Sequence, residues 1–259
     1  MFNRPPSNPL TPIPTLIAAA VALYARTFKP LFVTTVAIAL ALSTASAMLL
    51  PQPDIEQPET FRAVLFASVI LQAVSVGVLS VVLWRAALLR RGEPSSLKGA
   101  LSAVIAFGPR SFAGTMLLSL PLFVLLGSAG ALAFPALGLT LFVWVRASLY
   151  VPAVVLENQS IVGAFVRSWT LVQGRWRRTF LLELIVAIPI FVLTLVIGAL
   201  LAGASLPVLV AVDTLATGIF IPFVSIFGLL LFEDYVRASA GTPPQELGGQ
   251  PPDGAAPPR

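Results

Sequence analysis

The sequence predicts an all-α integral membrane protein in which six transmembrane helices form three hairpin repeats, each preceded by a short interfacial helix. Of the 259 residues, 57% are apolar and only 10% are charged, a balance far from that of soluble proteins. The apolar residues also gather into uncharged stretches, and a helix needs about 20 apolar residues to cross a bilayer. Six crossings nearly exhaust the chain, so we expect no separate soluble domain.

The uncharged stretches predict where the spans lie. We expect crossings at about 31–50, 63–84, 111–131, 133–156, 179–201 and 207–232. The polar, proline-rich segment 51–59 separates the first two crossings and is unsuited to burial in lipid. We expect the other hairpins to turn between Gly127 and Pro135 and around Gly203. The predicted membrane domain therefore covers residues 15–237.

Both ends of the chain, at 1–14 and 238–259, are predicted to be flexible tails because they are rich in Pro and Gly and have little to bury. The small residues Ala45-Ser46-Ala47 have the spacing of a signal-peptide cleavage site. A removable signal, however, has an apolar core of about 7 to 15 residues behind a short leader. Here a long leader precedes an apolar run of full spanning length, which favours a retained span.

A similar segment precedes each predicted hairpin. Each begins with a Ser or Thr and ends near a basic residue; the beginnings are Thr15–Ala19, Ser96–Ala100 and Ser160–Ala164, and the basic residues are Lys29, Arg110 and Arg175. We interpret these segments as the interfacial helices of a triplicated unit. The first is almost uniformly apolar until Arg26, so it can merge with the first span, although Lys29-Pro30 predicts a break.

Basic residues predict the orientation of the bundle. One side of the six-span arrangement carries Arg26, Lys29, Arg85, Arg90, Arg91, Lys98, Arg110, Arg167, Arg175, Arg177, Arg178 and Arg237. The opposite side carries only Arg62, so the positive-inside rule predicts cytoplasmic N- and C-termini. The excess of Arg over Lys and the abundance of Ala are typical of a GC-rich bacterial genome. We therefore expect a multi-pass protein of the bacterial inner (plasma) membrane.

The third interfacial segment, Ser160–Val172, has the clearest amphipathic pattern. Helical spacing puts Ile161, Phe165, Trp169 and Val172 on one face and Gly163, Arg167 and Thr170 on the opposite face. This pattern is typical of a helix lying in the bilayer interface, and Ser160 is its candidate N-cap.

Four basic residues in and after this segment are candidate contacts to anionic headgroups: Arg167, Arg175, Arg177 and Arg178. Each charge close to an anionic leaflet contributes about 1 kcal/mol to its attraction. The alternative is that these cations serve only to stop and orient the neighbouring spans.

The same stretch resembles a known family. Pro152–Glu157 and Ala164–Trp176 are similar to the signature of a six-span bacterial and archaeal membrane family, and its core matches Arg167, Ser168, Trp169, Leu171 and Gly174. That family includes the membrane domain attached to some glycerophosphoryl diester phosphodiesterases. The resemblance implies a fold and no activity, because in the fused members a separate soluble barrel carries the chemistry.

No constellation of residues in the sequence predicts a reaction. The chain has no His and no Cys, which excludes Ser-His and Cys-His nucleophilic pairs and His-rich metal sites. We find no phosphate-binding Gly-rich motif either. Glu233 and Asp234 are adjacent acids that point in different helical directions, and we interpret them as a solvated helix end in preference to a metal site. We predict no catalytic residue, no cofactor and no metal.

Three ionisable residues lie at membrane depth: Arg146, Glu183 and Asp213. Such residues are costly in lipid, at about 2.5 to 3.5 kcal/mol each on insertion scales, so they tend to pair or line polar cavities. Arg146 and Glu183 form a candidate intramembrane pair, the alternative being that both reach separately toward the headgroups. Asp213 is either a proton or cation site or a polar residue near the outer interface.

These observations favour a non-enzymatic integral membrane module that acts through lipid or protein partners. We expect membrane lipids, including anionic headgroups, as partners, together with a protein partner or a second copy of the chain, and no nucleic acid. The alternative function is a small permease with a polar path along Arg146, Glu183 and Asp213. The sequence leaves the substrate, the partner and the oligomeric state open.

Overall fold

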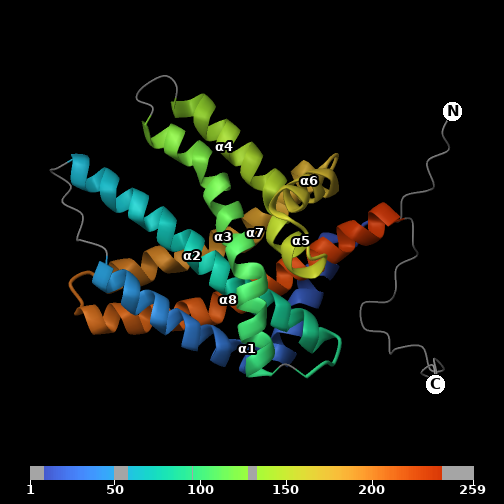
Figure 1. Cartoon of the computed structure of the whole chain (residues 1–259), viewed down its shortest axis with the longest axis horizontal. Coiled ribbons are helices and arrows are strands. Elements are labelled where there is room, and N and C mark those ends of the chain that lie inside the picture. Colours follow the sequence, from blue (N-terminus) through green and yellow to red (C-terminus); the bar gives the residue numbers. More distant parts are fainter. Residues whose placement is uncertain (1–8, 50–57, 95, 128–132, 241–259) are drawn as a thin grey trace.

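The computed structural model describes residues 9–49, 58–94, 96–127 and 133–240, and these residues form helices joined by short connections, with no strand among them (Figure 1). The helices are α1 (Ile13–Leu49), α2 (Pro58–Arg90), α3 (Leu97–Gly127), α4 (Ala133–Ala147), α5 (Tyr150–Leu156), α6 (Ile161–Val172), α7 (Trp176–Leu200) and α8 (Leu206–Ala240). Six stretches are long and apolar enough to cross a membrane, and the fourth, Leu137–Leu156, combines α4 and α5. The structure is therefore that of an all-helical protein with six membrane-spanning stretches.

The first and last helices, α1 and α8, pack against each other more extensively than any other pair, followed by α2 and α3. They run antiparallel: Thr11 just before α1 contacts Asp234 near the end of α8, and Ser43 near the end of α1 donates a hydrogen bond to Asp213 near the start of α8. This contact joins the first and third predicted hairpins into one bundle.

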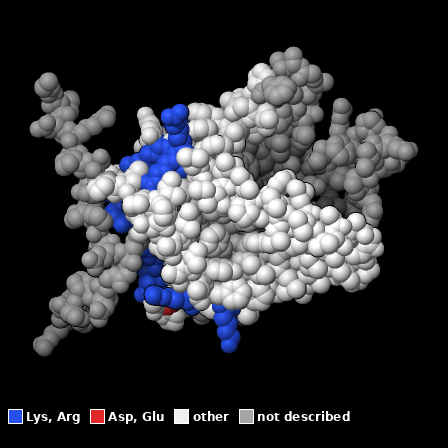
Figure 2. Space-filling view, turned by 180° about the vertical axis from the view of Figure 1, so that it is seen from behind, with Lys and Arg blue, Asp and Glu red and all other residues white. Residues whose placement is uncertain are grey.

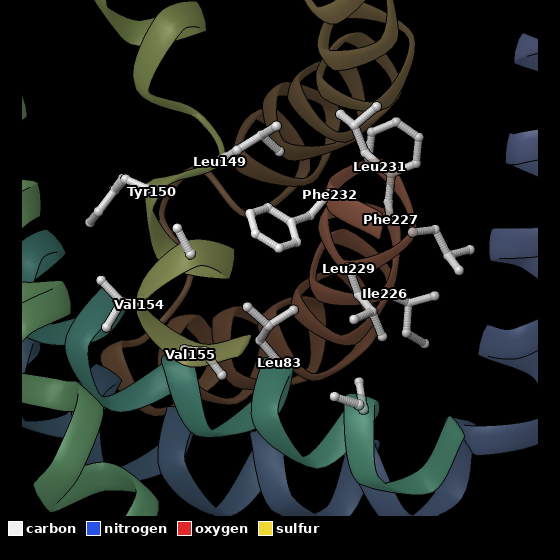
Figure 3. Close-up of a cluster of buried hydrophobic side chains, with 14 of the residues drawn as sticks. Leu83, Leu149, Tyr150, Val154, Val155, Ile226, Phe227, Leu229, Leu231 and Phe232 are labelled. Atoms are coloured by element: carbon white, nitrogen blue, oxygen red, sulfur yellow. The ribbon is translucent and has the colours of Figure 1, made fainter. Parts of the chain in front are cut away.

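The core lies where the short helix α5 meets α2 and α8. Figure 3 shows Val155 of α5 near Leu83 of α2, and Val154 on the other side of α5, in the same buried cluster as Phe232 of α8. The side chains of Val154, Val155, Leu83 and Phe232 are at most 5% exposed. Compared with exposure to water, burial of each such side chain stabilises the folded bundle by about 1.5 to 3 kcal/mol.

Helix α7 is packed only over its first turns. Thr179 and Leu182 are its buried residues, and α4 is the helix against which it packs most extensively. The rest of α7 exposes large apolar side chains, among them Phe191 and Leu195. An apolar helix surface of this extent is stable in lipid, which agrees with a spanning helix.

Two of the three predicted interfacial helices are not separate helices. Helix α1 continues through Pro30 without a break, and α3 continues through Pro109. The expected break at Lys29-Pro30 is therefore wrong, and the merged alternative is correct for the first unit. A proline removes one backbone hydrogen bond of the helix, the bond to the carbonyl four residues earlier, and the extensive packing of α1 against α8 keeps the helix continuous despite this loss.

The predicted fourth crossing, 133–156, is broken where a continuous helix was expected. Helix α4 ends at Ala147, Ser148 and Leu149 form a turn, and α5 starts at Tyr150. Helix α8 also runs to Ala240, so the tail predicted from 238 starts later than expected. The remainder of that tail, residues 1–8 of the N-terminal tail and the first two outer turns lie outside the described residues.

Every Lys and Arg whose side chain the structure describes belongs to one end of the bundle, where α1, α3 and α7 begin and α2, α4 and α8 end. Figure 2 shows these cations gathered toward one end of the face in view, while the described residues toward its other end include no Lys or Arg. The helical arrangement therefore brings together the cations that are scattered along the sequence.

Helices α2 and α3 cross closely at Gly77 and Gly108. A Cβ atom added at Gly77 would lie 2.9 Å from the Gly108 carbonyl oxygen, and a backbone atom in a packed helix cannot move aside easily. We expect Gly77→Ala to lower the free energy of unfolding by about 1 to 3 kcal/mol, the range of overpacked cores. The control is Gly198→Ala, where an added Cβ meets nothing within 4 Å; equal melting temperatures in detergent for the two variants would contradict the close crossing.

Candidate functional site at the break in the fourth span

Helix α6 lies beside the break between α4 and α5, and local sequence signals set its ends. The Ser160 side chain accepts a hydrogen bond from the Gly163 amide at 3.2 Å, which confirms the predicted N-cap. After α6, Gly174 adopts a φ of +76°, a conformation that glycine reaches without strain. Ser96 caps α3 in the same way, accepting from the Gly99 amide at 3.0 Å.

Ser168, at the centre of the family-like motif, bridges the break. Its hydroxyl donates to the Arg146 carbonyl at 2.8 Å and accepts from the Leu149 amide at 3.1 Å. The turn at Ser148–Leu149 frees backbone groups that a continuous helix would pair, and unpaired backbone groups are costly away from water. Ser168 is fully buried, so a single side chain of α6 stabilises the discontinuity in the fourth span.

The other motif residues hold α6 in place. Arg167 forms a two-pronged ion pair with Glu157, with nitrogen–oxygen distances of 2.7 to 3.1 Å. Leu171 is 1% exposed in the core, and the Trp169 carbonyl accepts a hydrogen bond from Arg146 at 3.1 Å. The motif found in the sequence therefore has a structural role, which is to dock α6 on the α4–α5 break.

Arg146 is not in an ion pair with Glu183. Its guanidinium lies over the Trp169 ring, 5.0 Å from the centroid, and over the Phe142 ring at 5.4 Å. The ion pairs among the described side chains join Arg90 to Glu233, Arg167 to Glu157 and Arg178 to Asp234. The predicted Arg146–Glu183 pair is therefore wrong as a direct contact, because the guanidinium lies against the ring and carbonyl of Trp169 in α6 and the Phe142 ring in α4.

Glu183 nevertheless lies near the break: its carboxyl group interacts with the hydroxyl of Ser148, which belongs to the turn between α4 and α5. Asp213 lies at the opposite end of the bundle, where it accepts a hydrogen bond from Ser43 at 2.5 Å. The structure thus brings Glu183 and the Arg146 segment to one region and leaves Asp213 near the start of α8, at the opposite end of the bundle. The three charged residues of the predicted polar path do not meet.

Aromatic rings fill the space between α4 and the start of α7. Phe142 stacks on Trp176 with centroids 6.2 Å apart, and Trp176 stacks on Phe180 at 5.2 Å. Three polar atoms in this region are buried and have no hydrogen-bond partner among the described residues: Arg146 Nε, Trp176 Nε1 and Glu183 Oε1. The region therefore combines an ordered ring stack with unsatisfied donors and an unsatisfied acceptor.

Three of the four predicted headgroup cations have partners within the protein, and their contact with headgroups stays a prediction. Arg167 pairs with Glu157, and Arg175 donates to the Tyr235 carbonyl at 3.2 Å. Arg178, whose side chain is 15% exposed, pairs with Asp234 at 3.1 Å. Arg177 is exposed and makes no such contact within the described part of the chain. Carboxylates neutralise Arg167 and Arg178, whereas Arg175 only donates hydrogen bonds to the Tyr235 carbonyl and the Ser239 hydroxyl.

Glu233 and Asp234 are not a solvated helix end, which corrects the sequence interpretation. Glu233 pairs with Arg90 of α2, and Asp234, which is 2% exposed, pairs with Arg178 of α7. Asp234 also accepts hydrogen bonds from the Thr11 amide at 3.1 Å and the Thr11 hydroxyl at 2.6 Å. The different helical directions of the two acids were predicted correctly, and they explain why each meets a different helix. Among the described residues no group of three or more His, Cys, Asp or Glu is arranged to hold a metal ion.

The exposed face of α6 differs from the face predicted to meet lipid. Phe165 stacks on Tyr150 with centroids 5.2 Å apart, and Val172 is fully buried. The exposed apolar side chains are instead Val162 at 72%, Val166 at 61% and Trp169 at 42%. The four-residue spacing of Val162 and Val166 could have indicated this exposed face. The prediction instead followed the larger aromatic residues, which include Phe165.

Sequence reasoning missed the residues that anchor the loop before α6. Arg110 of α3 donates to the Asn158 and Gln159 carbonyls at 3.2 and 3.0 Å and to the Asn158 side chain at 2.8 Å. Asn158 has a φ of +53°, which asparagine tolerates better than most residues. Arg110 was identified only as the basic end of a repeat segment, and nothing local to it indicates this contact.

Comparisons with known proteins place the chain in one family. No curated protein and no solved structure matches it. A family model described as a domain of unknown function, DUF7847, matches residues 7–238, and this match includes all of the helices except the last residues of α8. The match does not connect the chain to the membrane domain of glycerophosphoryl diester phosphodiesterases, so that resemblance stays a prediction. Because the matched region covers nearly the whole bundle, the chain belongs to the DUF7847 family of unknown function.

Proposed function

We propose that this protein is a non-enzymatic integral membrane module that acts on the lipids of one leaflet through α6 and the adjoining break in the fourth span. The proposal is supported above all by the exposed apolar stripe of α6, formed by Val162, Val166 and Trp169. Such a stripe on a short helix is typical of a helix that lies in the bilayer interface. Protein partners that dock on the same leaflet are compatible with this role.

The attachment of α6 supports the same proposal. Ser168 and Arg167 hold one side of the helix on the protein, so its exposed stripe has a defined orientation. The Trp169 ring is part of that stripe and lies against the Arg146 guanidinium. Tryptophan and arginine are both suited to the boundary between acyl chains and headgroups.

The distribution of charge supports placing this leaflet on the cytoplasmic side. All described Lys and Arg side chains belong to the end of the bundle that carries α6, and cations concentrate on cytoplasmic loops. We therefore propose cytoplasmic N- and C-termini and a bacterial plasma membrane as the location. Exposed cations such as Arg26, Lys29 and Arg177 would attract the anionic lipids of that leaflet.

A small permease is the second candidate, and the broken fourth span is the observation in its favour. Discontinuous helices often border binding sites in transporters. The separation of Asp213 from Arg146 and Glu183 argues against a continuous polar path through the three. We therefore prefer the lipid-directed role.

Spin labels test the position of α6, and the absence of Cys in the chain allows single-cysteine variants without further changes. A label in Val166→Cys should be relaxed by oxygen and shielded from a water-soluble nickel reagent, because we place the exposed stripe in the membrane interface. A label in Arg177→Cys is the control, since Arg177 is also exposed but should be accessible to nickel. Full nickel access at both positions in vesicles would exclude the interfacial role of α6.

A further inference from the structure

Helix α1 carries one uninterrupted exposed stripe. Its members recur every three or four residues and so share one face of the helix: Ala22, Arg26, Lys29, Val33, Ala37 and Leu40. Val33 is 61% exposed and Leu40 is 50% exposed, whereas Leu31 and Thr35 on the other side of the helix are fully buried. The stripe therefore points away from the rest of the bundle.

The length of α1 puts the two cations of the stripe at headgroup depth. From Lys29 to Leu49, its last residue, the helix is about 30 Å long at 1.5 Å per residue, which equals the thickness of the hydrocarbon core of a bilayer. The sequence 51–59 that follows is polar and proline-rich and unsuited to burial in that core. Arg26 and Lys29 therefore lie about one helical turn apart where α1 leaves the hydrocarbon, at the level of the lipid phosphates.

The protein does not neutralise these two cations. Arg26 and Lys29 are exposed and form no ion pair or hydrogen bond with the residues that the structure describes, whereas Arg90, Arg167 and Arg178 pair with carboxylates. Two free cations on one helix face can donate to the same anionic group, and such charge-assisted hydrogen bonds are stronger than neutral ones. A ligand of this face thus carries its negative charge at headgroup depth.

The rest of the stripe is apolar over the depth of one leaflet. From Lys29 to Leu40 the helix is about 16 Å long, close to half of the hydrocarbon thickness of about 30 Å. A ligand that fits the whole stripe therefore joins an anionic group to an apolar chain about as long as one leaflet is deep. A phospholipid with a net negative charge has these parts in this order, whereas an acidic segment of a water-soluble protein lacks the apolar chain.

We propose that the exposed stripe of α1 binds an anionic phospholipid. Arg26 and Lys29 donate to its phosphate oxygens, and one acyl chain lies along Val33, Ala37 and Leu40. The inference rests on the proposed function, which places this end of the bundle in the headgroup region, and it adds a lipid contact on a helix other than α6.

Fluorescence quenching by brominated lipids tests the site on the full chain. A bimane fluorophore on Val33→Cys reports the lipid beside the stripe, since the chain has no other Cys. In bilayers that mix phosphatidylcholine with phosphatidylglycerol, one of them brominated in its acyl chains, the quenching gives the relative affinity of the two lipids at this position. We expect phosphatidylglycerol to be preferred. The preference should fall about fivefold in Arg26→Gln and about fivefold again when Lys29→Gln is added, the factor that corresponds to about 1 kcal/mol per cation.

The control variant Arg91→Gln separates this site from the general charge of the bundle end. Arg91 is also exposed at that end but belongs to the connection after α2, so its loss should leave the preference at position 33 unchanged. Equal effects of Arg91→Gln and Arg26→Gln would overturn the site, and so would a preference that survives the loss of both Arg26 and Lys29.

Two further outcomes would overturn the proposal without any cation being replaced. Equal affinity for the two lipids at the label would mean that the stripe does not select negative charge. Absence of quenching by either brominated lipid would mean that another protein segment, such as a second copy of the chain, covers the stripe.

The tests of this inference and of the proposed function can fail separately. If the label at position 166 is embedded in the interface but the preference at position 33 does not depend on Arg26 and Lys29, the α1 site fails and the role of α6 stands. If the label at position 166 is fully exposed to water, the proposed function fails whatever lipid lies beside α1.

Discussion

Replacing Asp234 with Ala is expected to lower the free energy of unfolding by about 3 to 5 kcal/mol, the range for breaking a buried ion pair from one side. The change leaves the largely buried Arg178 without its carboxylate partner and removes the acceptor of both Thr11 hydrogen bonds. It therefore removes the hydrogen bonds that join the segment before α1 to α8, while the Thr11 carbonyl can still accept from Arg178 of α7. Thermal unfolding of the full chain in detergent, followed by its intrinsic fluorescence, measures the effect.

The adjacent acid provides the control for Asp234. The side chains of Arg90 and Glu233 are 27% and 36% exposed in their pair, and a partly exposed pair contributes less than a fully buried one. Glu233→Ala should therefore shift the melting temperature far less than Asp234→Ala. The double variant Asp234→Ala with Arg178→Ala should recover part of the loss, because no buried charge is then left unpaired. If the two single acid variants melt at the same temperature, the buried network does not stabilise the bundle.

Replacing Ser168 with Ala is expected to lower the free energy of unfolding by about 2 kcal/mol or more and to loosen α6 from the break. Ala cannot pair with the Leu149 amide or the Arg146 carbonyl, and each buried group left unpaired is destabilising by about 1 to 3 kcal/mol. The same variant should broaden the motion of a spin label at position 166. Ser168 thus links the stability of the fourth span to the position of α6.

Ser102→Ala is the matched control for Ser168→Ala. Ser102 is an exposed helical serine whose hydroxyl donates only to the Lys98 carbonyl one turn earlier, and we expect its loss to change the free energy of unfolding by less than about 0.5 kcal/mol. Equal effects of the two Ser variants on melting and on label motion would mean that the break does not depend on Ser168.

Local patterns in the sequence were reliable where a property depends on neighbouring residues. Apolar stretches identified six membrane-spanning stretches because spanning is a matter of length and composition. Ser160 was recognised as the N-cap of α6 because a cap involves residues only a few positions apart. The motif around Ser168 was recognised as a unit, although its role at the break was not.

The predictions that were wrong share a cause: the structure at those positions depends on residues that are far apart in the chain. The break at Ser148–Leu149 falls in an apolar stretch without Gly or Pro at the turn, and it is stabilised by Ser168 from another helix. Pro30 was expected to end a helix, but α1 continues through it within the packed bundle. In these cases the surrounding fold overrode the local preference.

The sequence by itself determined the helical class, the extent of apolar surface and the gathering of cations at one end of the alternating helices, because these follow from residue type and order. Only the tertiary structure decided which cations are neutralised and which polar groups stay unpaired. Arg178 meets Asp234 across more than fifty residues of chain, and Arg146 turns to Trp169 instead of Glu183. Electrostatic and hydrogen-bond energies depend on distances of a few ångströms, and those distances are set by the packing of whole helices.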